Sequence, residues 1–117
     1  GDEIELVTEH IPGLYLQAGD LILDLDRCHV IRQDREIALT PTEFGLLSLL
    51  IRGEGRVFSC QEIVREVQGY ECDEGEAREL LRMHIYRLRR KLEDDPSSPR
   101  YLVNVRGRGY TFSGYGR

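Results

Sequence analysis

Arginine side chains are concentrated in the last third of the chain. Residues 78–117 contain ten Lys and Arg against four Asp and Glu, although the whole chain has a net charge of −5. This segment therefore carries +6 and the remaining residues carry −11. A guanidinium group can grip phosphate oxygens in a bidentate way, or contact guanine O6 and N7 together. The separation of charge predicts one surface that meets a polyanion and another that repels it.

The first group of these arginines falls on a helix predicted over residues 76–92. Apolar residues recur there at steps of four, four, three and four, which places them on one helical face. This apolar stripe consists of Ala77, Leu81, Ile85, Leu88 and Leu92. At about 100° per residue, the opposite face is expected to carry Met83, Tyr86 and Arg90, flanked by Arg82, Arg87 and Arg89. The pattern predicts a helix with one buried face and one arginine-rich face.

The second group falls on a predicted β-hairpin over residues 101–113. Two strand-like runs, 101–105 and 110–113, are joined through Arg106-Gly107-Arg108-Gly109, where the glycines permit positive φ. The turn places Arg106 and Arg108 on a thin projection. Such a shape can enter a minor groove or lie along a nucleic-acid backbone.

The residues before this segment predict the elements that hold it. Four short β-like runs, at 14–17, 21–24, 28–31 and 36–39, indicate an antiparallel meander, with Cys28 expected as a strand core residue. Capping-box patterns at Thr40 and Ser59 open two helices, which glycines at 53 and 69 close. The expected fold is α+β: a four-stranded N-terminal antiparallel sheet, three helices and a C-terminal hairpin. This is the order of a winged helix-turn-helix.

Length and composition fit one globular domain, predicted over residues 14–113 between a lead-in at 1–13 and a tail at 114–117. No apolar run approaches the ~20 residues needed to cross a bilayer, so no membrane partner is expected. Three unpatterned cysteines favour a reducing compartment, and we expect a cytoplasmic location. We expect no enzymatic activity, no cofactor and no bound metal, because no nucleophile–base pair or ligand cluster is visible.

Together these residues resemble the DNA-binding effector domain of OmpR/PhoB-type two-component response regulators. The resemblance covers about residues 14–113 and implies a winged-helix domain that binds promoter DNA, commonly as tandem dimers on direct repeats. It rests on four stretches of this sequence: Leu39–Phe44 (LTPTEF), Gly55–Ser59 (GRVFS), His84–Leu92 (HIYRLRRKL) and Val105–Phe112 (VRGRGYTF).

The resemblance also implies roles for individual positions. Arg87 stands where a base is commonly read in the major groove, and His84 and Arg89 where backbone phosphate is held. Asn104 occupies a phosphate-contacting wing position and Arg106 the position that reaches into the minor groove. The loop at 69–75 corresponds to one that touches RNA polymerase in some members. The full set of candidate DNA-binding residues is Arg78, Arg82, His84, Tyr86, Arg87, Arg89, Arg90, Asn104, Arg106 and Arg108.

The chain departs from the family pattern at the start of its basic helix. Glu79 stands where a phosphate-binding Arg is usual, Arg82 where an Asp is usual, and Tyr86 replaces a position that is often polar or basic. The base sequence that the helix reads is therefore not carried over from the family.

Other readings of the same residues stay open at this point. The basic face fits a solvated surface, or a winged-helix module that docks an acidic protein and has lost specific DNA binding. Met83 and Tyr86 fit contacts with thymine methyls or sugars, or packing against a neighbouring protomer. His84 fits a local hydrogen bond, and the acidic loop at 69–75 fits a merely solvated loop.

Overall fold

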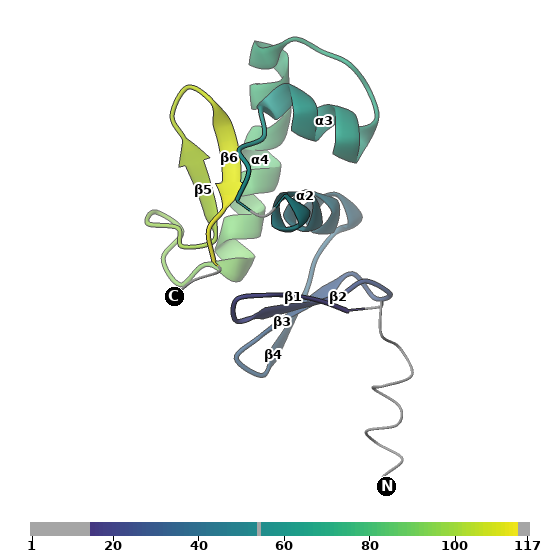
Figure 1. The fold of residues 1–117 in the computed structure, drawn as a ribbon, viewed down its shortest axis with the longest axis vertical. Helices are drawn as coiled ribbons and strands as arrows, with labels where there is room; N and C mark the ends of the chain where they lie inside the picture. Colours follow the sequence, from purple (N-terminus) through teal and green to yellow (C-terminus); the bar gives the residue numbers. More distant parts are fainter. Residues whose placement is uncertain (1–14, 54, 115–117) are drawn as a thin grey trace, which may run out of the picture.

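The computed structural model describes residues 15–53 and 55–114. Four strands, three helices and a two-stranded hairpin follow one another along the chain (Figure 1), as the sequence predicts. The predicted lead-in at 1–13, the first residue of the predicted domain and tail residues 115–117 lie outside the described residues. The elements are β1 (Tyr15–Ala18), β2 (Leu21–Asp24), β3 (His29–Arg32), β4 (Arg35–Ala38), α2 (Pro41–Arg52), α3 (Cys60–Gln68), α4 (Glu74–Leu92), β5 (Leu102–Val105) and β6 (Gly109–Phe112).

The N-terminal sheet is an antiparallel meander in the order β1-β2-β3-β4. Gln33 and Asp34 both have positive φ, which suits the tight two-residue turn that joins β3 to β4. The expectation for Cys28 was wrong. Its φ of 59° ends the turn before β3, where its N–H bonds to the Asp24 carbonyl, and it is only partly buried against the core. A left-handed residue cannot continue the strand, so β3 begins at His29.

Helices α2 and α3 begin where the capping boxes predict. The Thr40 hydroxyl accepts from the Glu43 N–H, and the Ser59 hydroxyl accepts from the Glu62 N–H. In each case the glutamate carboxylate bonds back to the N–H of the capping residue. At the start of each helix, free backbone N–H groups are therefore satisfied by side chains three residues apart in the sequence.

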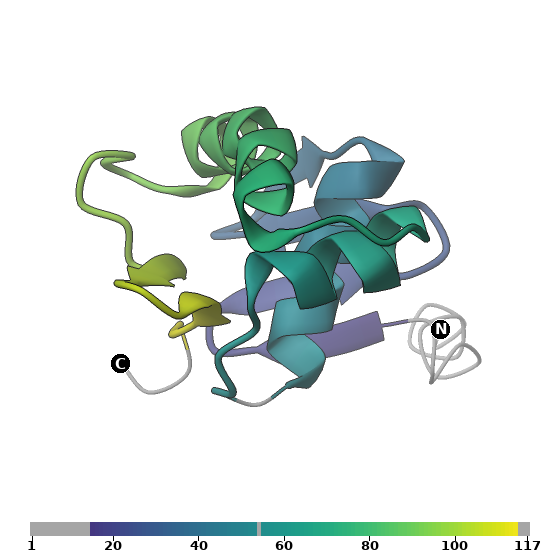
Figure 2. The same cartoon turned by 90° about the horizontal axis from the view of Figure 1, so that it is seen from above.

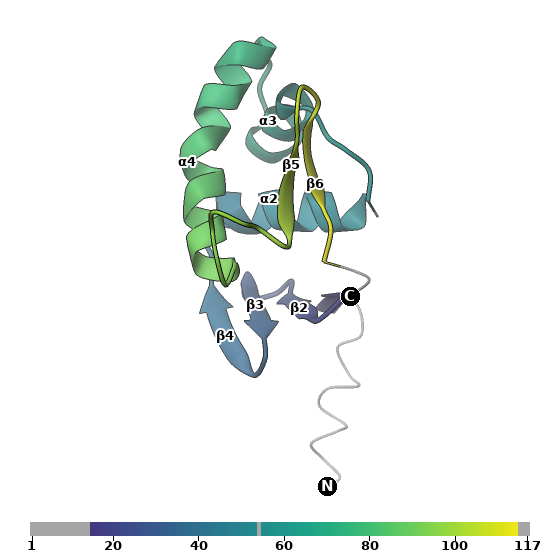
Figure 3. The same ribbon diagram turned by 90° about the vertical axis from the view of Figure 1, so that its left-hand side faces the viewer.

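Helix α4 begins two residues before the predicted start at 76 and runs to Leu92. Asp73 is its cap: the carboxylate oxygen Oδ1 accepts from the Glu76 N–H at 2.8 Å. The whole predicted stripe is buried against α2 and α3. Figure 3 shows α4 along one side of the molecule, with the sheet near its C-terminal end.

The hairpin forms the wing, defined here as β5, β6 and the turn between them. It is anchored to the helical part by a short bridge in which Phe58 and Tyr110 exchange both backbone hydrogen bonds, at 2.8 and 2.9 Å. Gly109 makes this approach possible, because a Cβ there would lie 1.9 Å from the Phe58 carbonyl oxygen. Figure 2 shows the connection from α4 running out along one side of the molecule before it turns into β5.

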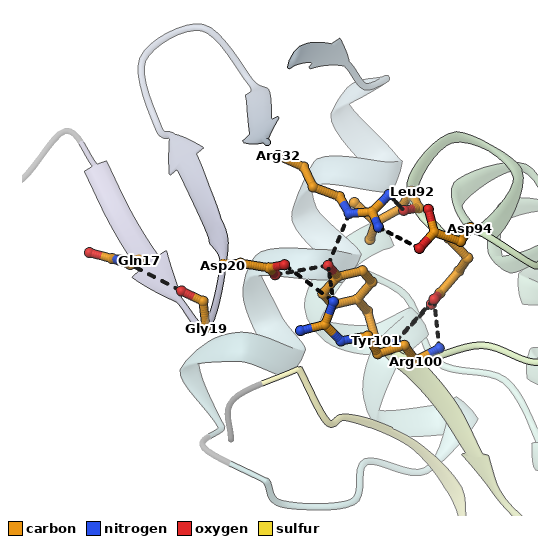
Figure 4. Close-up of polar contacts among 9 residues, drawn as sticks. Gln17, Gly19, Asp20, Arg32, Leu92, Asp94, Arg100 and Tyr101 are labelled. Carbon is orange, nitrogen blue, oxygen red and sulfur yellow. Dashed lines mark hydrogen bonds and ion pairs between the residues drawn. The ribbon is translucent and has the colours of Figure 1, made fainter. Parts of the chain in front are cut away.

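A polar cluster ties the sheet, the end of α4 and the start of the wing together (Figure 4). Arg32, only 3% exposed, donates to the Tyr101 hydroxyl, the Leu92 carbonyl and the Asp94 carboxylate. The Tyr101 hydroxyl also donates to Asp20 at 2.8 Å. Beside it, the buried Glu93 carboxylate accepts the N–H groups of residues 100, 101 and 102. These contacts fix the wing relative to α4.

Candidate nucleic-acid interface

A groove lies between α4 and the wing, and basic side chains line it from both sides. The α4–wing groove contains a hollow of about 480 Å³ that Arg78, Asn104 and Arg108 line, together with the wing turn. A second hollow of about 400 Å³ is lined by Arg82, Tyr86, Arg89 and Tyr110. The wing tip points toward the N-terminal end of α4 (Figure 1), so both hollows lie along one side of the helix.

Arg89 joins the helix to the wing. Its Nε and Nη2 both donate to the Leu102 carbonyl of β5, at 3.1 and 2.8 Å. The guanidinium carbon also lies 5.8 Å from the centre of the Tyr110 ring. The side chain is half-buried, whereas the helical pattern predicted it on an exposed flank. Its predicted phosphate contact stays a prediction, now with a second role in positioning the wing.

The exposed ridge of α4 consists of Glu79, Met83, Tyr86 and Arg90, spaced so that they follow one line opposite the buried stripe. Met83 and Tyr86 are 47% and 50% exposed, which confirms the predicted face. The Arg90 guanidinium donates to the Tyr86 hydroxyl at 3.4 Å and lies 5.7 Å from its ring centre. Arg82 donates to the Glu79 carboxylate at 3.1 Å.

Four of the candidate arginines are exposed and make no side-chain hydrogen bond or ion pair within residues 15–53 and 55–114: Arg78, Arg87, Arg106 and Arg108. Arg106 and Arg108 lie in the wing turn, whereas Arg87 lies on the side of α4 that faces away from the wing. Their charge is free to meet an external anion.

The His84 and Asn104 side chains differ in their internal hydrogen bonds. His84 is half-buried, and its ring makes no hydrogen bond to the part of the chain that the structure describes, so the local bond considered from sequence is not formed there. Asn104 uses its amide to donate to the Gly109 carbonyl at 3.3 Å, which braces the wing turn. Asn104 also borders the α4–wing groove.

Sequence reasoning missed the role of Glu74. Its two carboxylate oxygens accept from the Cys60 and Gln61 N–H groups, both at 3.2 Å, and so satisfy the first turn of α3. The sequence predicts Glu74 within an acidic loop at 69–75, and its separation of 13 and 14 positions from Gln61 and Cys60 gives no local signal for this contact. The Cys60 thiol beside it is inert, because burial and the Glu74 charge raise its pKa to about 11 despite the nearby Arg78.

Within the described ranges, no group of three or more His, Cys, Asp or Glu is arranged to hold a metal ion. No described helix combines the length and the apolar character that a membrane span requires. The expected absence of metal stays a prediction.

The sequence matches a family model described as "Transcriptional regulatory protein, C terminal" over residues 34–112. The chain belongs to this family. The match confirms the resemblance to OmpR/PhoB-type effector domains, and the family description names no enzyme class. It spans the basic helix and the wing but begins within the N-terminal sheet.

The chain is similar in sequence to known transcriptional regulators and in structure to solved DNA-binding domains. A probable transcriptional regulator, ycf27 of Porphyridium aerugineum, is 40% identical over 83% of this chain. The chain spans about 40% of that relative's length. The DNA-binding domain of CpxR from E. coli has a TM-score of 0.73 at 32% identity, covering 87% of this chain and 98% of that domain. The Klebsiella pneumoniae RstA domain, solved in complex with the RstA box, has a TM-score of 0.76 at 27% identity, covering 86% and 98%.

Proposed function

We propose that the chain is the DNA-binding effector domain of a transcription regulator, and that it recognises specific duplex sites through α4 and the wing. The observation that carries the proposal is the disposition of charge on α4. A helix whose apolar stripe is buried turns an arginine-bearing face outward. Beside it, the wing turn carries two arginines that have no side-chain partner among the described residues. The RstA domain, which is similar in fold, was solved in complex with its own DNA box, and this supports the proposal.

The dimensions of α4 suit the duplex major groove. A helix with its side chains is about 10–12 Å wide, and the major groove of B-DNA is about 12 Å wide. With α4 in the groove, Arg87 reads a base edge, while His84 and the Nη1 group of Arg89 hold backbone phosphate. Arg82 and Arg90 flank the same face, and Tyr86 contacts a thymine methyl or a sugar.

The wing and the α4–wing groove supply the second contact. Arg106 reaches into the adjacent minor groove, and Arg108 lies along the backbone. Arg78 lines the groove from α4, opposite Asn104 and Arg108 of the wing, so a phosphate that enters between the two arginines would meet donors from both walls. Glu74 also borders this hollow, but both of its carboxylate oxygens already accept hydrogen bonds from α3. These contacts fix orientation, whereas the base contacts of α4 give sequence preference.

Further partners follow from the family. We propose pairing of two copies on repeated sites, a contact with RNA polymerase through the segment at 69–75, whose last two residues begin α4, a cytoplasmic location and no enzymatic activity. The exposed Tyr70 supports the polymerase contact, because an aromatic side chain that is 45% exposed in an acidic loop offers an anchor to a basic protein surface.

Selection of bound duplexes from a random pool tests the proposal, followed by fluorescence anisotropy at two salt concentrations. We expect the selected site to bind ~10³-fold or more tightly than random duplex, with both affinities falling as salt rises. Equal, weak binding to every duplex would contradict the proposal. That result would favour a winged-helix module that docks an acidic protein through the same basic face.

A further inference from the structure

Glu79 is a carboxylate at the centre of the face that α4 turns outward. With the stripe buried and about 100° between successive residues, Glu79 lies almost directly opposite the stripe, at the head of the exposed ridge. Its side chain is 70% exposed. If α4 enters the major groove, this carboxylate enters with it. The inference therefore rests on the proposed function.

A carboxylate in that place repels the phosphates on both sides of the groove, so it cannot make the phosphate contact that the resemblance implies for an Arg at this position. Its contact with the fold does not account for it. The one partner of Glu79 among the described residues is Arg82, whose own side chain is 67% exposed, and exposed pairs one helical turn apart contribute little to stability. Glu74, by contrast, is used to cap α3. No strong contact with the fold thus occupies the Glu79 carboxylate, and it is available to a molecule that α4 binds.

We propose that Glu79 reads a cytosine in the major groove. Cytosine presents its N4 amino group there as a donor and no acceptor of its own, whereas guanine and thymine present acceptors and adenine presents an acceptor beside its donor. A carboxylate only accepts, so cytosine is the base edge that it fits without repulsion.

The ion pair with Arg82 prepares Glu79 for this contact. Arg82 Nη2 bonds to the carboxylate oxygen Oε2, and Oε1 accepts no hydrogen bond from the described residues. Oε1 is therefore available to N4 without breaking the pair. The remaining N–H groups of Arg82 can donate to O6 or N7 of the paired guanine. The two side chains together present an acceptor and donors that match the edge of a C·G base pair.

The test uses the selected duplex and a set of its analogues. In each analogue one cytosine is replaced by 2-pyrimidinone, which lacks only the 4-amino group. Wild type, Glu79→Ala and Glu66→Ala are compared by anisotropy. Glu66 is a matched control, because it is also an exposed helical glutamate next to an arginine (Arg65), but it borders α2 rather than the wing.

We expect wild type and Glu66→Ala to lose about tenfold or more in affinity at one replaced cytosine, and Glu79→Ala to bind that analogue and the parent duplex alike. Glu79→Ala should also bind random duplex more tightly than wild type, because a negative charge has left the interface. Unchanged thermal unfolding of both variants would exclude a folding defect.

An equal loss at every analogue in Glu79→Ala and wild type would overturn the assignment of Glu79 while leaving DNA binding intact. If wild type does not distinguish the selected duplex from random DNA, it is the proposed function that fails instead.

Discussion

Arg32 and Arg106 are the same residue type in opposite surroundings. Arg32 is 3% exposed, and its Nε, Nη1 and Nη2 groups each have an acceptor, at 3.0, 3.2 and 2.8 Å. Arg106 is exposed in the wing turn and has no side-chain partner in the described part of the chain. A satisfied guanidinium is part of the fold, whereas an unsatisfied one retains its charge and donors for another molecule. A buried and fully bonded arginine such as Arg32 therefore lies outside the interface, whereas the exposed arginines of α4 and the wing keep donors for DNA.

The polar cluster around Arg32 should respond to substitution with a loss of stability. Glu93→Ala gives the largest expected effect, since the N–H groups of residues 100, 101 and 102 lose their buried acceptor. We expect the free energy of unfolding to fall by about 3–5 kcal/mol, measured by urea denaturation. Asp95→Ala, an exposed neighbour, is the control and should cost about 1 kcal/mol or less. A Glu93→Ala variant as stable as that control would show that the cluster does not hold the wing.

Arg87→Ala removes an exposed arginine and should change DNA binding instead of stability. Arg87 has no side-chain partner in the part of the chain that the structure describes, so its loss should leave the free energy of unfolding within about 0.5 kcal/mol of wild type. Its affinity for the selected site should fall by about 1–3 kcal/mol, with preference relaxed at one base pair. Anisotropy against single-base variants of the site measures both. A uniform loss over all sequences would make Arg87 a phosphate contact instead of a base reader.

Arg89 lies between the two classes, because it is bonded internally and also borders the α4–wing groove. Arg89→Ala should lower the free energy of unfolding by about 1–2 kcal/mol and weaken binding to all duplexes alike. Arg89→Lys should recover part of the stability, since an ammonium can still donate to the Leu102 carbonyl. Hydrogen exchange of the β5 amides would report loosening of the wing. Unchanged exchange in Arg89→Ala would remove its positioning role.

Acid should weaken the internal contacts of the Glu43 and Asp20 carboxylates. Burial raises the pKa of Glu43, but the hydrogen bond from Lys91 at 2.6 Å and that from the Thr40 N–H outweigh it, so the pKa lies below its ordinary value of 4.5. The stabilisation is therefore complete above pH 4.5 and is lost as the pH falls through the lower folded-state pKa. Asp20 behaves in the same way: burial raises its pKa, but the hydrogen bonds from Tyr101 and Arg100 outweigh burial and hold the pKa below its ordinary value of 3.8.

Lys91→Met isolates the Glu43 contribution. It should reduce stability at neutral pH by about 1 kcal/mol and flatten the acid-induced loss, because the pair that acid would break is already absent. Thermal unfolding between about pH 7 and pH 3 measures this. An acid profile parallel to that of wild type would contradict the role given to this pair.

The order of elements could be predicted from the sequence because its signals are local. The capping boxes at Thr40 and Ser59 join groups three residues apart, and the stripe of α4 repeats within single turns. Asp73 and Glu76 have the same spacing, but the acidic run around them is typical of a loop, so the sequence predicts the start of α4 two residues too late.

The internal use of arginines could not be predicted in this way. Arg32 and Tyr101 are 69 positions apart, and no local pattern brings them together. Helical periodicity gives the direction of Arg89 from the axis, but not the strand that packs there and takes its N–H groups. Which arginines remain free for DNA thus depends on the tertiary structure.

The most direct test of the assignment of DNA binding to the α4 and wing surface is the salt dependence of binding in two double variants. Arg106→Ala/Arg108→Ala removes the free wing charges, and Arg35→Ala/Arg52→Ala removes two exposed charges from β4 and α2. About five phosphate contacts give wild type a slope of log K against log salt near −4 to −5. We predict a slope shallower by about 2 for the wing variant and an unchanged slope for the control, with equal melting temperatures. Equal slopes for both variants would contradict the assignment of DNA binding to the α4 and wing surface.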